Sequence, residues 1–170
     1  VPLSEVAAAL GRATVRSRWR LEVADRPDGV TVINDAYNAN PDSMRAALKT
    51  LAAVGGGRRR TVAVLGEMLE LGETAQAEHD SLGRLAVRLG VSRLVAVGDG
   101  ARAIHLGATQ EGSWDGESVF VPDVAAALEF LAGDLGAGDV VLVKASRGAG
   151  LERVAAALLE PAGAGEGATR

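Results

Sequence analysis

Short apolar and β-branched runs alternate with helical segments from residue 29 onward, and this alternation constrains the fold more than any other feature. Buried strands of parallel sheets form continuous apolar runs of this kind, as the run at 61–65 does. We predict strands over residues 29–33, 61–65, 93–97, 118–121 and 139–143. Apolar residues at helical spacing predict helices over residues 41–54, 74–89, 101–106 and 151–159, and a further helix from Asp123 onward. Residues 107–117 are predicted to form a loop.

Strands that alternate with helices predict an α/β fold, in this case a Rossmann-like, mainly parallel sheet with helices on both faces. A further run at residues 19–23 precedes the strand at 29–33, and this hairpin would add an antiparallel strand at one edge. A chain of 170 residues is long enough to bury one core, and we assign a single domain to residues 17–160. The Gly- and Ala-rich residues 161–170 are expected to be disordered.

The composition excludes several classes of function. The chain has no cysteine, so disulfides and thiolate metal sites are excluded. No apolar run approaches the roughly 20 residues of a membrane span, and no N-terminal segment resembles a secretory signal. We therefore expect a cytoplasmic protein with no membrane insertion. A net charge of −4 and an aromatic fraction of 3% argue against nucleic-acid binding. The basic triplet at residues 58–60 is predicted to be a solvated loop.

The polar loop between the strand at 29–33 and the helix at 41–54 is the strongest candidate for a site. Asn40 stands at the N-cap position, and Pro41 at the first helical position. Asp35, Tyr37 and Asn38 lie in the loop itself. Open α/β sheets bind ligands at such junctions, and phosphate suits the positive end of the helix. The alternative is a well-capped turn, because Asn, Asp and Pro are ordinary turn residues.

Three segments resemble the Mur ligase family. NDAYNANPDSMRAAL at residues 34–48 is similar to a family signature, and VLGEMLELG at 64–72 and VKASR at 143–147 follow in the family's order. The resemblance implies the C-terminal domain of an ATP-dependent ligase, with residues 1–16 as the trailing helix and linker of a preceding domain. Within the family, the segments most resemble the member that adds D-alanyl-D-alanine to UDP-N-acetylmuramoyl-tripeptide.

The resemblance also implies what the domain needs from elsewhere. Its partners would be those two substrates and the N-terminal and central domains of the same enzyme. The cofactors would be ATP and Mg²⁺, with the Mg²⁺ ligands in the absent central domain and no metal bound by this chain. The fragment alone would therefore be inactive.

The resemblance assigns an ATP-binding role to five residues. Arg20 would be the catalytic residue that reaches the γ-phosphate, since a guanidinium suits phosphate oxygens. Asp35 would accept the ribose hydroxyls, with Tyr37, Asn38 and Asn40 as further nucleotide contacts. Trp19 stands where the family often has glycine, and Arg18 is the alternative phosphate contact.

A second set would bind the dipeptide substrate. Lys144, Ser146 and Arg147 follow a strand just before a helix, where two cations oppose the helix dipole and suggest a bound carboxylate. Ala145 replaces a common family glycine. The resemblance places Glu67 and His79 at the border of the same cleft, although loop carboxylates usually face water and a helical histidine is usually structural.

Three alternatives remain open from the sequence. Gly98 to Ala103 form a G-x-G-x-x-A pattern after a strand, with Asp123 downstream, so a free-standing dinucleotide-binding domain is the runner-up. The pattern does not follow the first strand, and the chain has no P-loop. The others are a related Mur-type ligase with a different amino-acid substrate and a non-catalytic interaction domain.

Overall fold

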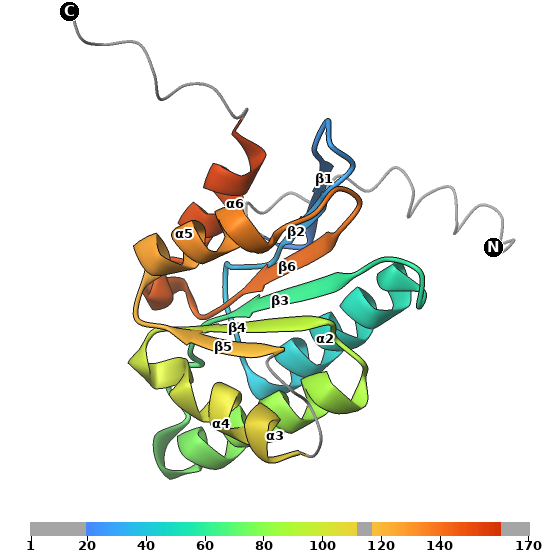
Figure 1. Ribbon diagram of the computed structural model, residues 1–170. Coiled ribbons are helices and arrows are strands. Elements are labelled where there is room, and N and C mark those ends of the chain that lie inside the picture. The colour runs from blue at the N-terminus through green and yellow to red at the C-terminus, as the bar shows by residue number, and fades with distance from the viewer. Residues whose placement is uncertain (1–19, 112–116, 161–170) are drawn as a thin grey trace, which may run out of the picture.

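A six-stranded sheet with the strand order β1-β2-β6-β3-β4-β5 forms the centre of the computed structural model, which describes residues 20–111 and 117–160. The strands are β1 (Glu22–Asp25), β2 (Thr31–Asn34), β3 (Thr61–Leu65), β4 (Arg93–Val97), β5 (Ser118–Val121) and β6 (Val140–Lys144). β2 to β6 are parallel, and β1 pairs antiparallel with β2 at one edge (Figure 1). The predicted α/β class and the antiparallel edge strand are confirmed.

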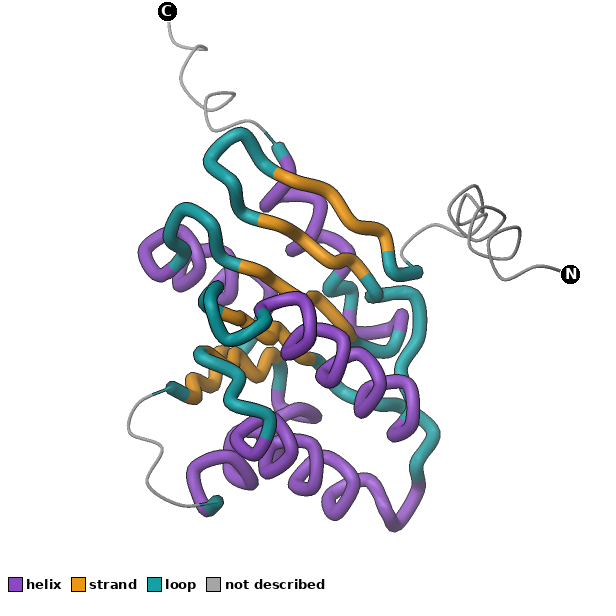
Figure 2. The backbone as a smooth tube through the Cα atoms, turned by 90° about the vertical axis from the view of Figure 1, so that its right-hand side faces the viewer, coloured by secondary structure: helices purple, strands orange, loops and turns teal. Residues whose placement is uncertain are grey.

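Helices cover both faces of this sheet. They are α2 (Pro41–Gly55), α3 (Ala75–Arg88), α4 (Arg102–Gln110), α5 (Val124–Asp134) and α6 (Glu152–Leu159), with short 3₁₀ turns at Gly72–Thr74, Asp99–Ala101 and Arg147–Ala149. α2, α3 and α4 lie on one face and α5 and α6 on the other, as Figures 1 and 2 show. Each face has its own buried apolar cluster.

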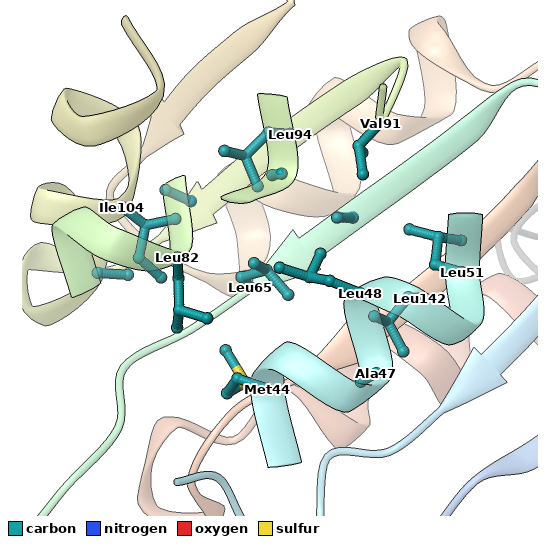
Figure 3. Close-up of a cluster of buried hydrophobic side chains, with 14 of the residues drawn as sticks. Met44, Ala47, Leu48, Leu51, Leu65, Leu82, Val91, Leu94, Ile104 and Leu142 are labelled. Carbon is teal, nitrogen blue, oxygen red and sulfur yellow. The ribbon is translucent and has the colours of Figure 1, made fainter. Parts of the chain in front are cut away.

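The cluster beneath α2 shows why this helix is amphipathic. Met44, Leu48 and Leu51 recur at helical spacing and are fully buried. They pack beside Leu65 of β3 and Leu142 of β6 (Figure 3). Burial of such a side chain stabilises the fold by roughly 1.5–3 kcal/mol. The helix that begins at the polar loop is thereby fixed to the centre of the sheet.

The strand order determines where a ligand can bind. The chain goes from β2 through α2 to β3, and β6 later inserts between these two strands. The loops after β2, β6 and β3 therefore lie side by side at the carboxyl edge of the sheet. Open α/β sheets bind ligands at such a topological switch point.

Two of the sequence predictions are wrong in their extent. The loop predicted at 107–117 begins later, because α4 continues to Gln110. A Cβ atom at Gly83 of α3 would collide with the carbonyl oxygen of Ile104, and one at Gly107 with that of Asp80. The two helices approach closely through these glycines, and this tertiary contact accompanies the longer α4. The strand predicted at 19–23 is Glu22–Asp25 in the described part of the chain.

The prediction of a solvated loop at residues 58–60 is also wrong for two of the three arginines. Arg59 Nε donates to Gly138 O (2.6 Å), and its Nη2 donates to Thr31 Oγ1 (2.9 Å). Arg60 forms an ion pair with Asp139 (2.8 Å). These half-buried guanidinium groups join β2, β3 and the start of β6 at the amino edge of the sheet.

Other predictions cannot be compared with the structure. The described residues do not include the predicted trailing helix and linker at 1–16, Arg18, Trp19 or the tail at 161–170. Within the described ranges, no helix combines the length and apolarity needed to cross a membrane.

The close approach of α3 and α4 yields a first prediction. Gly83→Ala should lower the free energy of unfolding by about 1–3 kcal/mol, because the new methyl group meets backbone atoms that cannot move aside. Gly133→Ala in α5 is the matched control, since a Cβ atom there meets nothing within 4 Å. The control should be stabilising by about 0.4–1 kcal/mol. Urea denaturation followed by circular dichroism measures both, and equal effects would contradict the tight helix contact.

A second prediction concerns pH. Burial and the nearby positive charge of Arg102 lower the pKa of His105, whose Nδ1 lies 2.8 Å from Ser118 Oγ. Below about pH 6.5 the unfolded chain binds a proton at this histidine that the folded chain resists. The free energy of unfolding should therefore fall as the pH drops from 7 through this range. His105→Gln should remove that part of the slope in urea titrations at pH 7.5, 6.5 and 5.5, whereas an unchanged slope would exclude His105 as its source.

Candidate functional site

The loop after β2, residues 35–40, forms a ridge between two hollows at the carboxyl edge of the sheet. The Arg20 hollow, of about 420 Å³, is lined by Arg20, Asp35, Tyr37, Asn38, Asn40, Lys144 and residues of α2. The Arg147 hollow, of about 530 Å³, is lined by Asn38, Ala39, Asn40, Ser146, Arg147, Gly148 and residues 69–71. All five residues predicted to bind nucleotide therefore lie around one hollow. Ser146 and Arg147 lie in the other.

The ridge is held in shape by its own polar side chains. Asn40 caps α2, since its Oδ1 accepts from Ser43 N (2.8 Å) while Ser43 Oγ accepts from Asn40 N (3.1 Å). Asn34 Oδ1 accepts from Ala36 N (3.3 Å) at the other end of the loop. The predicted N-cap is confirmed. The N–H groups of Ser43 and Met44 are therefore both bonded to Asn40, the second through its carbonyl oxygen (3.0 Å).

Lys144 lies beneath the ridge. Its side chain is 2% exposed, and Nζ donates to Asp35 Oδ2 (2.6 Å) and Asn38 O (2.9 Å). The sequence grouped Lys144 with Ser146 and Arg147 as a substrate contact. The structure instead places its ammonium group at the base of the Arg20 hollow, where it holds the backbone and the carboxylate of the loop.

Asp35 connects the ridge to Leu21, the residue before the edge strand β1. Its Oδ1 accepts from Leu21 N (3.2 Å), while Oδ2 takes the ion pair with Lys144. A carboxylate has about four acceptor positions, so each oxygen retains capacity for another donor. The Asp35 carboxylate can therefore accept hydrogen bonds from the hydroxyl groups of a ligand while Leu21 N and Lys144 Nζ hold it in position.

Ser146 ties three loops together. The residue is 4% exposed, and its hydroxyl accepts from Leu69 N (2.9 Å) and donates to Ala39 O (3.4 Å). Ser146 N also donates to Glu67 O (2.9 Å), which extends the pairing of β6 with β3 beyond the strands. Arg147, in contrast, is exposed at the mouth of its hollow. Of the predicted dipeptide contacts, only Arg147 presents a charged group to this space.

Tyr37 contacts a cation from each hollow. The Arg20 Cζ lies 4.3 Å from the centre of its ring, and the Arg147 Cζ lies 5.9 Å from it. Both distances fall in the range of cation–π attraction. The predicted phosphate-binding and carboxylate-binding arginines thus meet at one aromatic side chain.

His79 and Glu67 lie outside both hollows. His79 is 3% exposed; its Nε2 accepts from Met68 N (2.8 Å), so the proton of the neutral ring is on Nδ1, which donates to Ala75 O (2.6 Å). Nε2 therefore holds the loop after β3 against α3, while the Nδ1 bond lies within α3 and fixes the orientation of the ring. The Glu67 carboxylate lies against Gly100 and lines a separate cavity of about 210 Å³.

The glycine turn at 98–103 is poorly suited to a dinucleotide. The Glu67 carboxylate occupies the approach to Gly100, where a negative pyrophosphate would be repelled. Asp123, the predicted ribose partner, caps α5 by accepting from Ala126 N (2.9 Å). The turn also follows β4, away from the switch point. The structure does not favour the runner-up function.

Sequence reasoning missed other residues that line the hollows. Ala46 and Thr50 contribute one face of α2 to the Arg20 hollow, and their spacing of four residues could have revealed them. Leu69 and Leu71 form an apolar side of the Arg147 hollow within a loop that otherwise looked acidic. Across the ranges 20–111 and 117–160, no group of three or more His, Asp or Glu side chains is placed to hold a metal ion.

The model of the family described as Mur ligase, glutamate ligase domain, matches residues 19–147. The chain belongs to the Mur ligase family. The predicted family membership is thereby confirmed. The match includes β1 to β6, all residues that line the Arg20 hollow, and all of those that line the Arg147 hollow except Gly148.

Individual members of the family are similar over most of this chain. UDP-N-acetylmuramoyl-tripeptide–D-alanyl-D-alanine ligase of Mycobacterium tuberculosis is 56% identical over 92% of this chain and 34% of its own length. MurF from Acinetobacter baumannii has a TM-score of 0.77 at 31% identity, covering 95% of this chain and 34% of that one.

MurF from Thermotoga maritima, solved in complex with ADP, has a TM-score of 0.66 at 26% identity, covering 88% of this chain and 34% of that chain. This chain therefore spans about a third of the length of these relatives.

The buried ammonium group under the ridge gives a third prediction. Lys144→Met should lower the free energy of unfolding by about 3 kcal/mol, because it leaves the Asp35 carboxylate and the Asn38 carbonyl without their partner. The exposed Lys49 on α2 provides the matched control, and Lys49→Met should change stability by less than about 0.5 kcal/mol. Thermal unfolding of both variants tests the difference. Equal melting temperatures would show that the ion pair does not stabilise the fold.

Proposed function

We propose that this chain is the C-terminal domain of the ATP-dependent ligase that joins D-alanyl-D-alanine to UDP-N-acetylmuramoyl-tripeptide in peptidoglycan precursor synthesis. The observation that carries the proposal is the ridge, which separates a hollow with the five nucleotide candidates from one with Arg147. The names and the 52–56% identity of the mycobacterial relatives support the choice of substrate. Such an enzyme would act in the cytoplasm, where ATP and the UDP-linked tripeptide are both available.

The Arg20 hollow would receive ATP. The Arg20 guanidinium offers paired donors for phosphate oxygens, and the start of α2 adds the positive end of a helix dipole. Asp35 would accept the ribose hydroxyls, and Asn38 and Asn40 would contact the nucleotide from the exposed side of the ridge. The ADP complex of the Thermotoga relative supports a nucleotide in a protein of this fold.

The Arg147 hollow would receive the dipeptide. Arg147 would bind its carboxylate, while Leu69 and Leu71 offer an apolar surface to small methyl side chains. Ser146 and Lys144 would act mainly by holding the loops in place, since their polar atoms are already bonded within the protein. His79 would do the same for the loop after β3.

The reaction needs activation, because a carboxylate is a poor electrophile until one oxygen becomes a leaving group. ATP would transfer its γ-phosphoryl group to the terminal carboxylate of the tripeptide, with release of ADP. The dipeptide amine would then attack the acyl phosphate and expel phosphate as the amide forms. Arg20 would stabilise the charge on the transferred group. Mg²⁺ supplies further charge neutralisation when bound, and its ligands would come from the other two-thirds of the protein.

The test is made with the full-length protein that contains this domain. Phosphate release with ATP and the UDP-linked tripeptide should depend on D-alanyl-D-alanine and not on L-alanyl-L-alanine. Activity with another amino acid or dipeptide would instead favour a related Mur-type ligase. Absence of any nucleotide or acceptor binding would favour a non-catalytic interaction domain. The 170-residue chain alone should release no phosphate.

A fourth prediction concerns Arg20. In the full-length enzyme, Arg20→Ala should lower kcat by about 100-fold or more, the range typical for loss of one group that stabilises transition-state charge. The KM for the dipeptide should change little, because Arg20 lies in the other hollow. Arg102→Ala is the control, since Arg102 is an exposed cation paired with Asp99 outside both hollows. Steady-state kinetics measure both parameters, and an unchanged kcat would reject the role of Arg20.

A further inference from the structure

Tyr37 is the only tyrosine in the chain, and it stands on the ridge between the two hollows. The guanidinium groups of Arg20 and Arg147 both lie over its ring, with Cζ atoms 4.3 and 5.9 Å from the ring centre. These arginines come from opposite ends of the chain and are both exposed to solvent. The sequence assigned Tyr37 to the nucleotide alone, so its contact with Arg147 has no role in that assignment.

An aromatic ring can order the side chain of an exposed arginine before an anion binds to it. The negative face of the ring attracts a guanidinium within about 6 Å and restricts the rotamers of its long side chain. A side chain that is ordered in advance loses less conformational entropy when an anion binds. The ring itself is half-buried beside Asp35 and Asn38, whose positions are fixed by Lys144. The Tyr37 ring is therefore held in one position, against which both arginines can pack.

We propose that Tyr37 is a positioning residue for both substrates: its ring holds Arg20 toward the ATP phosphates and Arg147 toward the dipeptide carboxylate. This inference rests on the proposed function and extends it, since one side chain then sets the affinity for two ligands in separate hollows. It differs from a nucleotide contact, which would affect ATP alone. It also differs from a purely structural role, which would reduce the amount of folded enzyme and leave both KM values unchanged.

The kinetic test uses the full-length enzyme with Tyr37→Leu, which removes the ring face. The KM for ATP and the KM for D-alanyl-D-alanine should each rise about two- to five-fold, the equivalent of one exposed cation–π contact. Tyr37→Phe keeps the ring and should restore both KM values to within about two-fold. Phe120→Leu is the matched control, because Phe120 carries Arg102 at 4.0 Å on β5, outside both hollows. It should leave both KM values unchanged.

A double substitution tests whether Tyr37 acts through Arg147. In an Arg147→Met background, Tyr37→Leu should no longer raise the KM for the dipeptide, while it should still raise the KM for ATP. A rise in the ATP value alone in the single variant would overturn the inference, as would unchanged values for both substrates. Equal behaviour of Tyr37→Phe and Tyr37→Leu would also overturn it, because the ring would then not be the active feature. Tyr37→Met replaces Tyr37→Leu if the latter does not fold.

An NMR measurement on the 170-residue chain keeps the inference separate from the proposed function. The ring current of Tyr37 should shift the side-chain resonances of both Arg20 and Arg147, and Tyr37→Leu should remove both shifts. Arg102, stacked on Phe120, serves as the internal reference that does not change. The proposed function would be rejected if the wild-type full-length protein formed no product. The double role of Tyr37 would be rejected if Tyr37→Leu removed the shift of Arg20 but not that of Arg147.

Discussion

The ion pair between Lys144 and Asp35 is the interaction on which the site depends. A buried ammonium group requires partners, because an unpaired charge in the protein interior is strongly unfavourable. Lys144 finds them in the Asp35 carboxylate and in the Asn38 carbonyl. The end of the central strand β6 thus fixes the loop after β2, and the ridge acquires one defined shape.

The ridge in turn separates the two hollows, and a second side chain, Ser146, helps to hold it in place. Ser146, two residues beyond Lys144, binds the same loop at Ala39 and the loop after β3 at Leu69. Three segments that are distant in sequence are therefore joined by two side chains of one strand end. The exposed arginines lie outside this rigid frame, where they can meet ligands while the groups beneath them stay bonded within the protein.

Much of the fold could be predicted from local patterns. The strands at 61–65, 93–97 and 118–121 were predicted with their observed limits, because continuous apolar runs between turn residues leave little choice. Asn40 and Pro41 similarly marked the start of α2. The order of the strands and the length of α4 depend on contacts between distant segments, such as the glycine contacts of α3 with α4. Periodicity carries no information about such contacts.

The candidate site was predictable in its residue types more than in their roles. The motifs identified Arg20, Asp35 and Tyr37, which the structure brings around one hollow. The direction in which a side chain points at a strand end depends on neighbours that only the fold supplies. Lys144 is therefore buried beneath the ridge although it looked like a ligand contact. Residues 59 and 60 were misjudged for the same reason, since their carbonyl and carboxylate partners come from the far end of the sequence.

The burial of Lys144 has a practical consequence for chemical labelling. The chain contains two lysines, Lys49 and Lys144, and only Lys49 has an exposed side chain. Amine-reactive dyes or cross-linkers would therefore attach to the described part of the chain at a single lysine on α2. Lys49 is not among the residues that line either hollow. Lys49 is thus a site at which a fluorophore or a surface linker can be attached while both hollows stay open.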